Sequence, residues 1–384
     1  MNESSPSSAT LASPQPSTGE IAEARSALKL LFALPGFHRY DRGAEVALLA
    51  VASELARSGD VVTVAGSGEP RPGAPYRFYQ VPSVRRERFE RLPKFPPFRS
   101  ETSWEDATFA TNLMVRERLA DYDATITCSF PFTQWSLRAK SPSRTAHLFV
   151  TQNGDWPAVT NASEYRSFDC DGLVCTNPDY LARNQEKWNC ALIPNGVDLK
   201  RFQPGASCRE RFGLPANRPV ILMVSAFIES KRVLDGIKAV SKLDDAFLAV
   251  AGDGPLRGEA RQLAAELLPG RYNQLTLSAD EMPDLYRCAD AFLHLSLLES
   301  FGNVFLEAWA CGLPIVAHET ERLRWILGAG QFLCDTEQEQ QLVTQLRSAL
   351  FAGKTPAPAG IERFAWPAIA EQYREFIVGI LARR

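Results

Sequence analysis

The sequence predicts an α/β protein made of two doubly wound domains that face a cleft. Apolar runs of strand length alternate with stretches of helical period over residues 28–66, and this alternation is stronger beyond residue 218. The runs are almost continuously apolar, as the strands of a parallel sheet must be when helices cover both of its faces. Between the two halves lies a segment rich in Pro, Gly and charged residues (193–219), which is typical of a domain boundary.

The first half opens with a strand, a helix and a second strand. Residues 28–36 ("LKLLFALPG") are expected to form a buried strand, and residues 43–59 a helix whose apolar residues recur at three-to-four spacing. Residues 60–66 ("DVVTVAG") form the next strand. Because the helix lies between the two strands, the sheet is expected to be parallel.

Six further strands are expected beyond the boundary, with helical stretches between them. They cover residues 220–227, 246–252, 275–278, 291–298, 313–318 and 331–334. Trp366 and Pro367 open a last amphipathic helix, and the residues alone leave open whether it caps the second domain. We therefore expect a disordered Ser/Pro-rich segment (1–25), a first Rossmann-like domain (26–204), a second (205–366) and the last helix (367–384).

Composition and charge exclude several classes of protein. The chain has 384 residues, 45% of them hydrophobic, and a formal net charge of −3, so no overall positive field attracts nucleic acid. No pair among its eight Cys has Cys-x-x-Cys spacing, and no apolar run reaches the ~18–20 residues of a membrane span. The N-terminus shows no export signal. We expect a cytoplasmic protein with reduced thiols.

The residue types that bind metals are not arranged for that purpose. The four His show no ligand spacing. Asp169, Cys170 and Asp171 match an Asp-x-Asp metal-binding pattern, but they directly precede the strand-like "GLVCTN" and are interpreted as structural. We expect neither a metal nor a cofactor.

The segment "SLLESFGNVFLEAWACGLP" (296–314) places two glutamates eight positions apart. Glu299 follows a predicted strand, and a turn leads from it into a helix whose first N–H groups form an anion site. Glu307 lies one turn inside this helix, where its carboxylate could accept from the vicinal hydroxyls of a ribose. The alternative is a helix with acidic residues that its macrodipole stabilises, but a charge in such apolar surroundings needs a partner. The turn and the helix start comprise Phe301, Gly302, Asn303 and Val304.

Two cations are expected in the same cleft. Lys231 and Arg232 follow the strand at 220–227 and its loop, so they lie at the carboxyl end of a strand. There they would balance a diphosphate and stabilise it as a leaving group. The alternative is a pair of solvated loop cations. Gly43, at the start of the first long helix, could approach the same phosphate from the other domain, or else be a turn glycine.

Together these residues resemble the GT-B glycosyltransferases, specifically the retaining family 4. The resemblance covers nearly everything from Leu28 onward. Its most specific segments, in chain order, are "IPNGVDLKRFQPG", "AGDGP", "MPDLYRCADAFLHLSLLESFG", "FGNVFLEAWACGLPIVA" and "FAWPAIAEQY".

The resemblance implies a GT-B fold in which the second domain binds a nucleotide-diphosphate sugar, such as a UDP- or GDP-sugar, and the first binds the acceptor. It implies that Glu307 contacts the ribose, Glu299 the donor sugar and Lys231 the diphosphate. Gly43 is implied to approach the phosphate, and the last helix to cross back onto the first domain. The residues implied to lie near the base are Leu277 and Ser278.

Three positions depart from the family pattern. Ser225 stands where members commonly have Arg, and Arg232 is interpreted as compensating for it. Arg42 and Gly43 replace a Gly-Gly pair. Many members have a His after the strand in "HLFVTQNGDWP", where this chain has "QNGD". The residues there that we expect to contact the acceptor or the donor sugar are Asn153 and Asp155.

We expect a metal-independent, hexosyltransferase-type enzyme that moves a sugar to an acceptor hydroxyl with retention, in the synthesis of a glycan, glycolipid or glycoside. Glu299, Lys231 and Arg232 are its expected catalytic residues. One alternative is a non-catalytic relative that binds sugar nucleotides. Another is a nicotinamide-dependent enzyme, which needs a Gly-x-Gly-x-x-Gly fingerprint after the first strand. Here Gly66-Ser67-Gly68 is followed by Arg71 in place of the third Gly, and it ends the second strand.

A basic and aromatic segment (76–99) bears on the acceptor. Phe89, Phe95 and Phe98 are interleaved there with six cations, which are Arg85, Arg86, Arg88, Arg91, Lys94 and Arg99. An anionic or lipid-linked acceptor would fit it, as would peripheral contact with the inner face of a membrane. The alternative is a solvated helix and loop in which Glu87 and Glu90 offset the charge.

Overall fold

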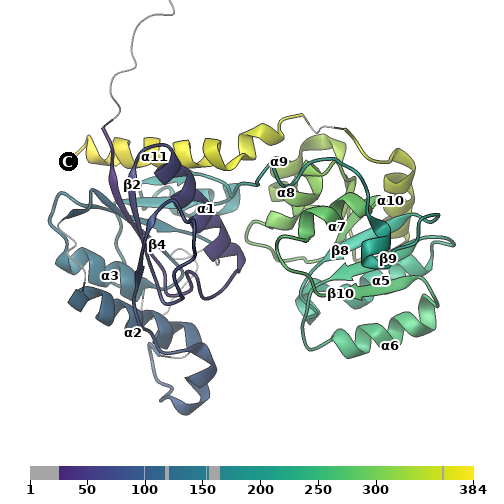
Figure 1. Ribbon diagram of the computed structural model, residues 1–384, viewed down its shortest axis with the longest axis horizontal. Helices are drawn as coiled ribbons and strands as arrows, with labels where there is room; N and C mark the ends of the chain where they lie inside the picture. The colour runs from purple at the N-terminus through teal and green to yellow at the C-terminus, as the bar shows by residue number, and fades with distance from the viewer. Residues whose placement is uncertain (1–25, 99, 117–120, 153, 155–164, 357–358) are drawn as a thin grey trace, which may run out of the picture.

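A computed structural model of the chain contains two parallel β-sheets, each enclosed between layers of helices (Figure 1). The structure describes residues 26–98, 100–116, 121–152, 154, 165–356 and 359–384. The segment expected to be disordered (1–25) lies outside the described residues, as do Asn153 and Asp155. Within the described part of the chain, no helix is both long enough and apolar enough to cross a membrane.

The first sheet has seven strands in the order β3-β2-β1-β4-β5-β6-β7, and all its neighbouring strands pair in parallel. The strand order reverses between β1 and β4, and doubly wound sheets bind ligands at such a switch point. The strands are β1 (Lys29–Ala33), β2 (Val61–Gly66), β3 (Arg77–Gln80), β4 (Ala124–Cys128), β5 (Ala146–Val150), β6 (Gly172–Cys175) and β7 (Cys190–Leu192).

Helices cover both faces of the first sheet because successive strand residues point to opposite sides. Leu30 and Phe32 of β1 pack on α1 (Gly43–Arg57) and α11 (Trp366–Leu381). Leu31 and Ala33 belong to the opposite core with α2 (Glu101–Arg116) and α3 (Pro131–Lys140). A short helix, α4 (Pro178–Asn184), joins β6 to β7.

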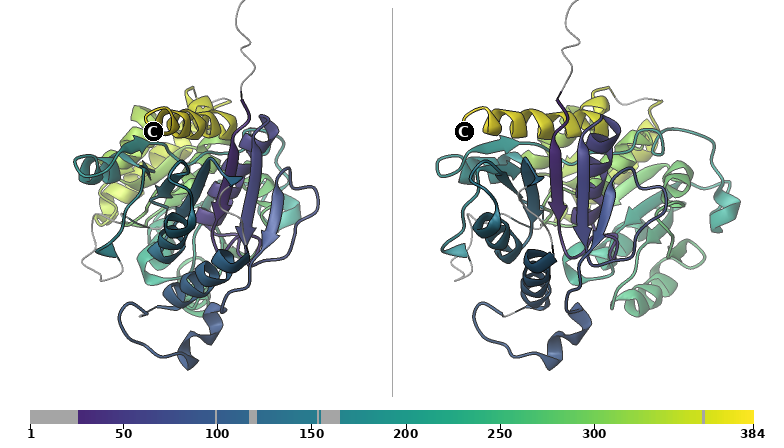
Figure 2. Two further views of the ribbon diagram at one scale, coloured as in Figure 1. Left: turned by 90° about the vertical axis from the view of Figure 1, so that its left-hand side faces the viewer. Right: turned by 60° about the vertical axis from the view of Figure 1, so that its left-hand side comes forward.

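The last helix lies along the first sheet, as Figures 1 and 2 show. Ile369, Tyr373 and Ile377 of α11 are buried in the core that α1 shares. Arg374 of the same helix forms a buried ion pair with Asp60, with 3.2 Å between Nε and Oδ2. The end of the chain is therefore anchored on the domain in which the described structure begins.

The second sheet has six strands in the order β10-β9-β8-β11-β12-β13, again with parallel neighbours. They are β8 (Val220–Val224), β9 (Phe247–Ala251), β10 (Tyr272–Leu275), β11 (Ala291–His294), β12 (Ile315–His318) and β13 (Phe332–Cys334). One face packs on α7 (Met282–Cys288), α8 (Asn303–Ala310) and α9 (Glu321–Leu327). The other packs on α5 (Val233–Ser241), α6 (Arg257–Leu267) and α10 (Glu339–Ala352).

Several expected strands, such as 28–36 and 220–227, extend about three residues beyond the observed ones, and two further strands differ in other ways. The run 291–298 leaves the sheet after His294, because the Ser296 hydroxyl donates to the Leu298 carbonyl (3.0 Å) and Leu298 is exposed. The strand expected at 275–278 lies earlier, at Tyr272–Leu275, where it pairs with β9. Apolar content therefore predicted that these strands exist but not where they begin and end.

Candidate functional site

A pocket of about 530 Å³ lies between the two domains. It lies beyond the carboxyl ends of β8, β9 and β11, where doubly wound sheets bind their ligands. The second domain supplies most of the wall, including residues 299–304. The first domain supplies Gly43, Ala44, Gln152 and Asn195.

A chain of polar side chains forms one wall of this pocket. Lys231 ends a 3-10 turn (Glu229–Lys231) after β8, and its ammonium forms an ion pair with Glu299. The same oxygen of Glu299 lies 2.9 Å from Nε2 of His294. Nδ1 of His294 lies 3.3 Å from the Ser225 hydroxyl. Lys231, Glu299, His294 and Ser225 all line the pocket.

The surroundings of Glu299 keep its carboxylate ionised. Burial by itself raises the pKa of this carboxyl, but the hydrogen bond and charge of His294 and the charge of Lys231 outweigh it and lower the pKa to about 2. The pair is partly accessible, since the side chains of Lys231 and Glu299 are 22% and 21% exposed. An entering anion could attract Lys231, and the carboxylate could then accept from hydroxyls.

The start of α8 forms another wall. Gly302 precedes the helix with φ +86°, a conformation that L side chains rarely adopt, and a Cβ there would come within 2.6 Å of the Phe305 ring. Gly302, at the N-cap position, has no side chain with which to cap this helix start. Phe301, Gly302, Asn303 and Val304 line the pocket, so the N-terminal end of α8 meets it and favours an anion there.

The first domain faces this helix start through Gly43, the first residue of α1. A Cβ at Gly43 would lie 3.9 Å from Nδ2 of Asn303. Two helix N-termini, one from each domain, therefore meet across the pocket. Their partial positive charges add where a diphosphate would bind.

Arg232 does not line the pocket, contrary to the expectation that it shares the cleft with Lys231. Its backbone is left-handed, with φ +53°. Its guanidinium donates to Asp235 (2.9 Å) and to the side chain and carbonyl of Thr336 (both 3.0 Å). Arg232 therefore connects the start of α5 to the segment after β13. Its guanidinium does not enter the pocket to compensate for the Arg that Ser225 replaces.

Glu307 also lies outside the residues that line the pocket. Its carboxylate accepts a hydrogen bond of 2.8 Å from the Tyr286 hydroxyl, and burial raises its pKa although this bond lowers it. Leu277 packs against the core, and the Ser278 hydroxyl donates to Glu281 (2.8 Å). Both follow the end of β10, and neither lines the pocket.

Several pocket residues were not among the expected site residues, His294 and Asn195 among them, whereas Gln152 belongs to the "QNGD" segment that was expected to line this region. His294 is the last residue of β11, and Asn195 and Gln152 come from the first domain after β7 and β5. A position at or shortly after the end of a strand was the one available signal. It was applied to Lys231, Glu299 and the segment of Gln152 but not to His294 or Asn195.

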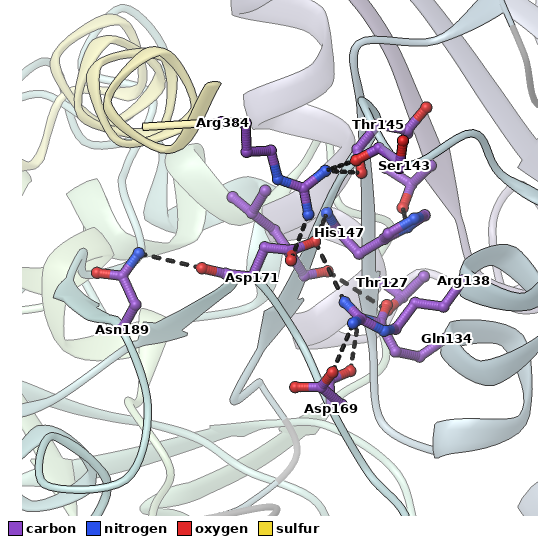
Figure 3. Close-up of polar contacts among 12 residues, drawn as sticks. Thr127, Gln134, Arg138, Ser143, Thr145, His147, Asp169, Asp171, Asn189 and Arg384 are labelled. Atoms are coloured by element: carbon purple, nitrogen blue, oxygen red, sulfur yellow. Dashed lines mark hydrogen bonds and ion pairs between the residues drawn. The ribbon is translucent and has the colours of Figure 1, made fainter. Parts of the chain in front are cut away.

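The Asp-x-Asp segment, just before β6, is engaged in ion pairs (Figure 3). Arg138 contacts both carboxylates, at 2.5 Å for Asp169 and 3.2 Å for Asp171, and Arg384 also contacts Asp171. The backbone N–H of His147 donates to Asp171 (2.7 Å). These contacts join β5, α3 and the C-terminal residue. Among the residues that the structure describes, no cluster of three or more His, Cys, Asp or Glu could hold a metal ion.

Residues 207–359 match the family described as Glycosyl transferases group 1. The lipopolysaccharide core biosynthesis glycosyltransferase LpsE of Rhizobium meliloti is 31% identical over 203 residues, which are 51% of this chain and 58% of that protein. A GDP-mannose-dependent alpha-(1-6)-phosphatidylinositol dimannoside mannosyltransferase of Mycobacterium tuberculosis is 28% identical over 217 residues, 54% of each chain. The chain thus spans little more than half the length of these relatives.

The fold matches solved structures over nearly the whole chain. HepE from Anabaena, solved in complex with UDP, superposes with a TM-score of 0.69 and 17% identity, over 92% of this chain and 100% of that one. At this identity the likeness concerns the fold alone, which agrees with the two parallel sheets.

Proposed function

On the premise that residues 207–359 form a Glycosyl transferases group 1 domain within a GT-B fold, we propose that this protein is a retaining glycosyltransferase. It moves a sugar from a nucleotide-diphosphate sugar to an acceptor hydroxyl without a metal. The observation that carries the proposal is the Lys231–Glu299 ion pair beside the uncapped start of α8, inside the interdomain pocket.

The donor is proposed to be a UDP- or GDP-sugar. A relative that depends on GDP-mannose and a structural neighbour that holds UDP support these two classes. Lys231, Gly43 and the first N–H groups of α8 would hold the diphosphate. Glu299 would accept from hydroxyls of the transferred sugar. Glu307 would accept from the ribose, and the base would lie toward Leu277 and Ser278.

The reaction is proposed to run on one face of the sugar. The acceptor oxygen forms a bond to the anomeric carbon while the bond from that carbon to the diphosphate oxygen breaks. The departing phosphate oxygen takes the proton of the acceptor hydroxyl, and Lys231 with the α8 N–H groups stabilises the charge that leaves. Because attack and departure share a face, the anomeric configuration is retained.

The acceptor is proposed to be anionic or lipid-linked, and the basic segment of the first domain would meet it. Figure 2 shows residues 85–98 projecting beyond the rest of that domain. Arg85, Arg88, Arg91 and Lys94 are exposed, and the half-exposed Phe95 packs at 5.4 Å from Phe98. Exposed cations beside aromatic rings suit an anionic lipid surface.

Flotation with vesicles tests this part of the proposal. The protein should float with vesicles that contain anionic lipid at low salt, and not with purely zwitterionic ones. A variant with Gln in place of the four cations should stay at the bottom of the gradient. Flotation of neither protein with anionic vesicles would discard the membrane contact.

Turnover of a donor panel tests the proposed activity. Thermal unfolding with UDP- and GDP-sugars should single out one donor, since a ligand that binds the native state raises the unfolding temperature. With that donor, release of the nucleotide diphosphate should continue in EDTA, and NMR should show a newly released or transferred sugar with the donor's anomeric configuration. Binding without any hydrolysis or transfer would instead indicate a sugar-nucleotide binding protein.

A further inference from the structure

Three side-chain amides form a continuous chain from the first domain into the donor pocket. The amides of Gln152 and Asn195 exchange two hydrogen bonds, of 2.6 and 3.1 Å. Nδ2 of Asn195 also donates to Oδ1 of Asn303 at 2.9 Å. Asn303 is the first residue of α8, so the chain ends at the proposed diphosphate site.

The amide chain restricts the orientation of its members. Gln152 and Asn195 are 8% and 4% exposed, so water cannot readily replace a lost partner. Both hydrogens of the Asn195 amide are used, one for each neighbour. One amide cannot rotate alone without setting two oxygens or two N–H groups against each other. The orientations of the three amides are therefore coupled, and each amide keeps its donor and acceptor atoms on fixed sides.

This arrangement decides which atom Asn303 presents to the pocket. Its oxygen is taken up by Asn195, so its other amide atom, Nδ2, is left for the pocket side, toward Gly43. An N–H group there can donate to a phosphate oxygen. The reverse orientation would set the carbonyl oxygen of Asn303 against an anion, which is unfavourable.

We propose that Asn195 and Gln152 are positioning residues for the donor, which act through Asn303. They turn its NH₂ group toward the diphosphate, so that the second domain's phosphate site is completed by amides of the first domain. This inference rests on the proposed function, because it assumes that a diphosphate binds at α8. It also makes donor affinity depend on contact between the domains.

A double-mutant cycle tests the role of Asn195. N195D is isosteric but cannot donate to Asn303, which must then turn its own NH₂ group toward residue 195. N303A removes the amide that is positioned. Affinities of wild type, N195D, N303A and the double variant would be measured by calorimetry for UDP and GDP, and for uridine and guanosine as phosphate-free probes. N195A, which adds no charge, repeats the cycle if N195D does not fold.

The expected result is specific to phosphate and non-additive. N195D and N303A should each weaken binding of the diphosphate about tenfold, and the nucleoside should bind equally to all variants. The double variant should be no weaker than N303A, because Asn195 acts only through Asn303.

Three outcomes would overturn the inference. They are an unchanged affinity in N195D, an equal loss for the nucleoside, or losses that multiply in the double variant, as a general structural or charge effect would give. If wild type bound neither diphosphate, the proposed function itself would fall and the inference with it, so the two failures are distinguishable.

Discussion

Lys231 and Glu299 form an ion pair across 68 residues of sequence, inside the pocket between the domains. Their strands explain the meeting. β8 and β11 are neighbours in the second sheet and pair through Ile221 and Ala291, so the loops after both strands lie at the same edge. The pair places an ammonium beside a carboxylate. The ammonium would bind the diphosphate of a nucleotide sugar, and the carboxylate would accept hydrogen bonds from the sugar's hydroxyls.

Removing the positive charge of Lys231 should slow the reaction more than it destabilises the protein. In Lys231→Met we expect donor turnover to fall about 100-fold or more, because the leaving diphosphate loses its cation. Lys238→Met is the matched control, since Lys238 is an exposed lysine of α5 that contacts Asp235. Initial rates with the selected donor measure both. Equal rates in the two variants would remove Lys231 from the mechanism.

The carboxylate of Glu299 should make stability depend on acidic pH. Its pKa in the folded protein is about 2, below the ordinary value of 4.5, so the unfolded chain binds this proton more readily. The carboxylate therefore stabilises the fold above about pH 4.5, and this contribution is lost as the pH falls toward 2. Urea unfolding of wild type and Glu299→Gln should show a difference that shrinks from pH 6 to pH 3. A constant difference would contradict the low pKa.

Glu307 should show the opposite sign. Burial raises its pKa, so at neutral pH its ionised form costs folding free energy that the protonated form does not. Below the ordinary carboxyl pKa both states are protonated and the cost disappears. Glu307→Gln should therefore be more stable than wild type near pH 7 and equal to it near pH 4, by urea unfolding.

The same variant, Glu307→Gln, tests the proposed ribose contact. Wild type should bind UDP or GDP more tightly than the corresponding 2′-deoxynucleotide, and the variant should bind the two with similar affinity if Glu307 binds the ribose.

The turn before α8 should not tolerate a side chain. Gly302→Ala would place a Cβ against the Phe305 ring at a positive φ, and we expect a loss of about 1–3 kcal/mol of unfolding free energy together with weaker donor binding. Gly258→Ala in α6 is the control, because its Cβ would meet nothing within 4 Å. That variant should be neutral or up to about 1 kcal/mol more stable. Similar losses in both would show that the Gly302 turn is not special.

The fold class could be predicted because the alternation of apolar strands with helical stretches implies parallel sheets covered by helices. Apolar runs such as β8 and β9 are buried on both sides, and the comparison with known structures confirms the two-domain architecture. Strand ends were harder to predict. Leu298 is apolar yet exposed, because a turn at Ser296 ends the strand, and local hydrophobicity does not reveal such a turn.

The sequence could predict only those site residues that lie in loops directly after strands. Lys231 and Glu299 meet because β8 and β11 are neighbours in the sheet, whereas the sequence placed both only at carboxyl ends of strands in one cleft. Arg232 instead binds Asp235 and Thr336, and the local sequence does not reveal a partner 104 residues away. Asn195 contacts Asn303 across 108 residues and two domains, so that contact depends on how the domains sit together.

Calorimetric titration of one nucleotide sugar tests the central claim most directly. The donor selected from the UDP- and GDP-sugar panel should bind wild type at a single site. Lys231→Met should bind it at least tenfold more weakly, and Lys238→Met should bind as wild type does. If no nucleotide sugar binds wild type, or if Lys231→Met binds as tightly as wild type, the pocket at Lys231 and Glu299 is not the donor site.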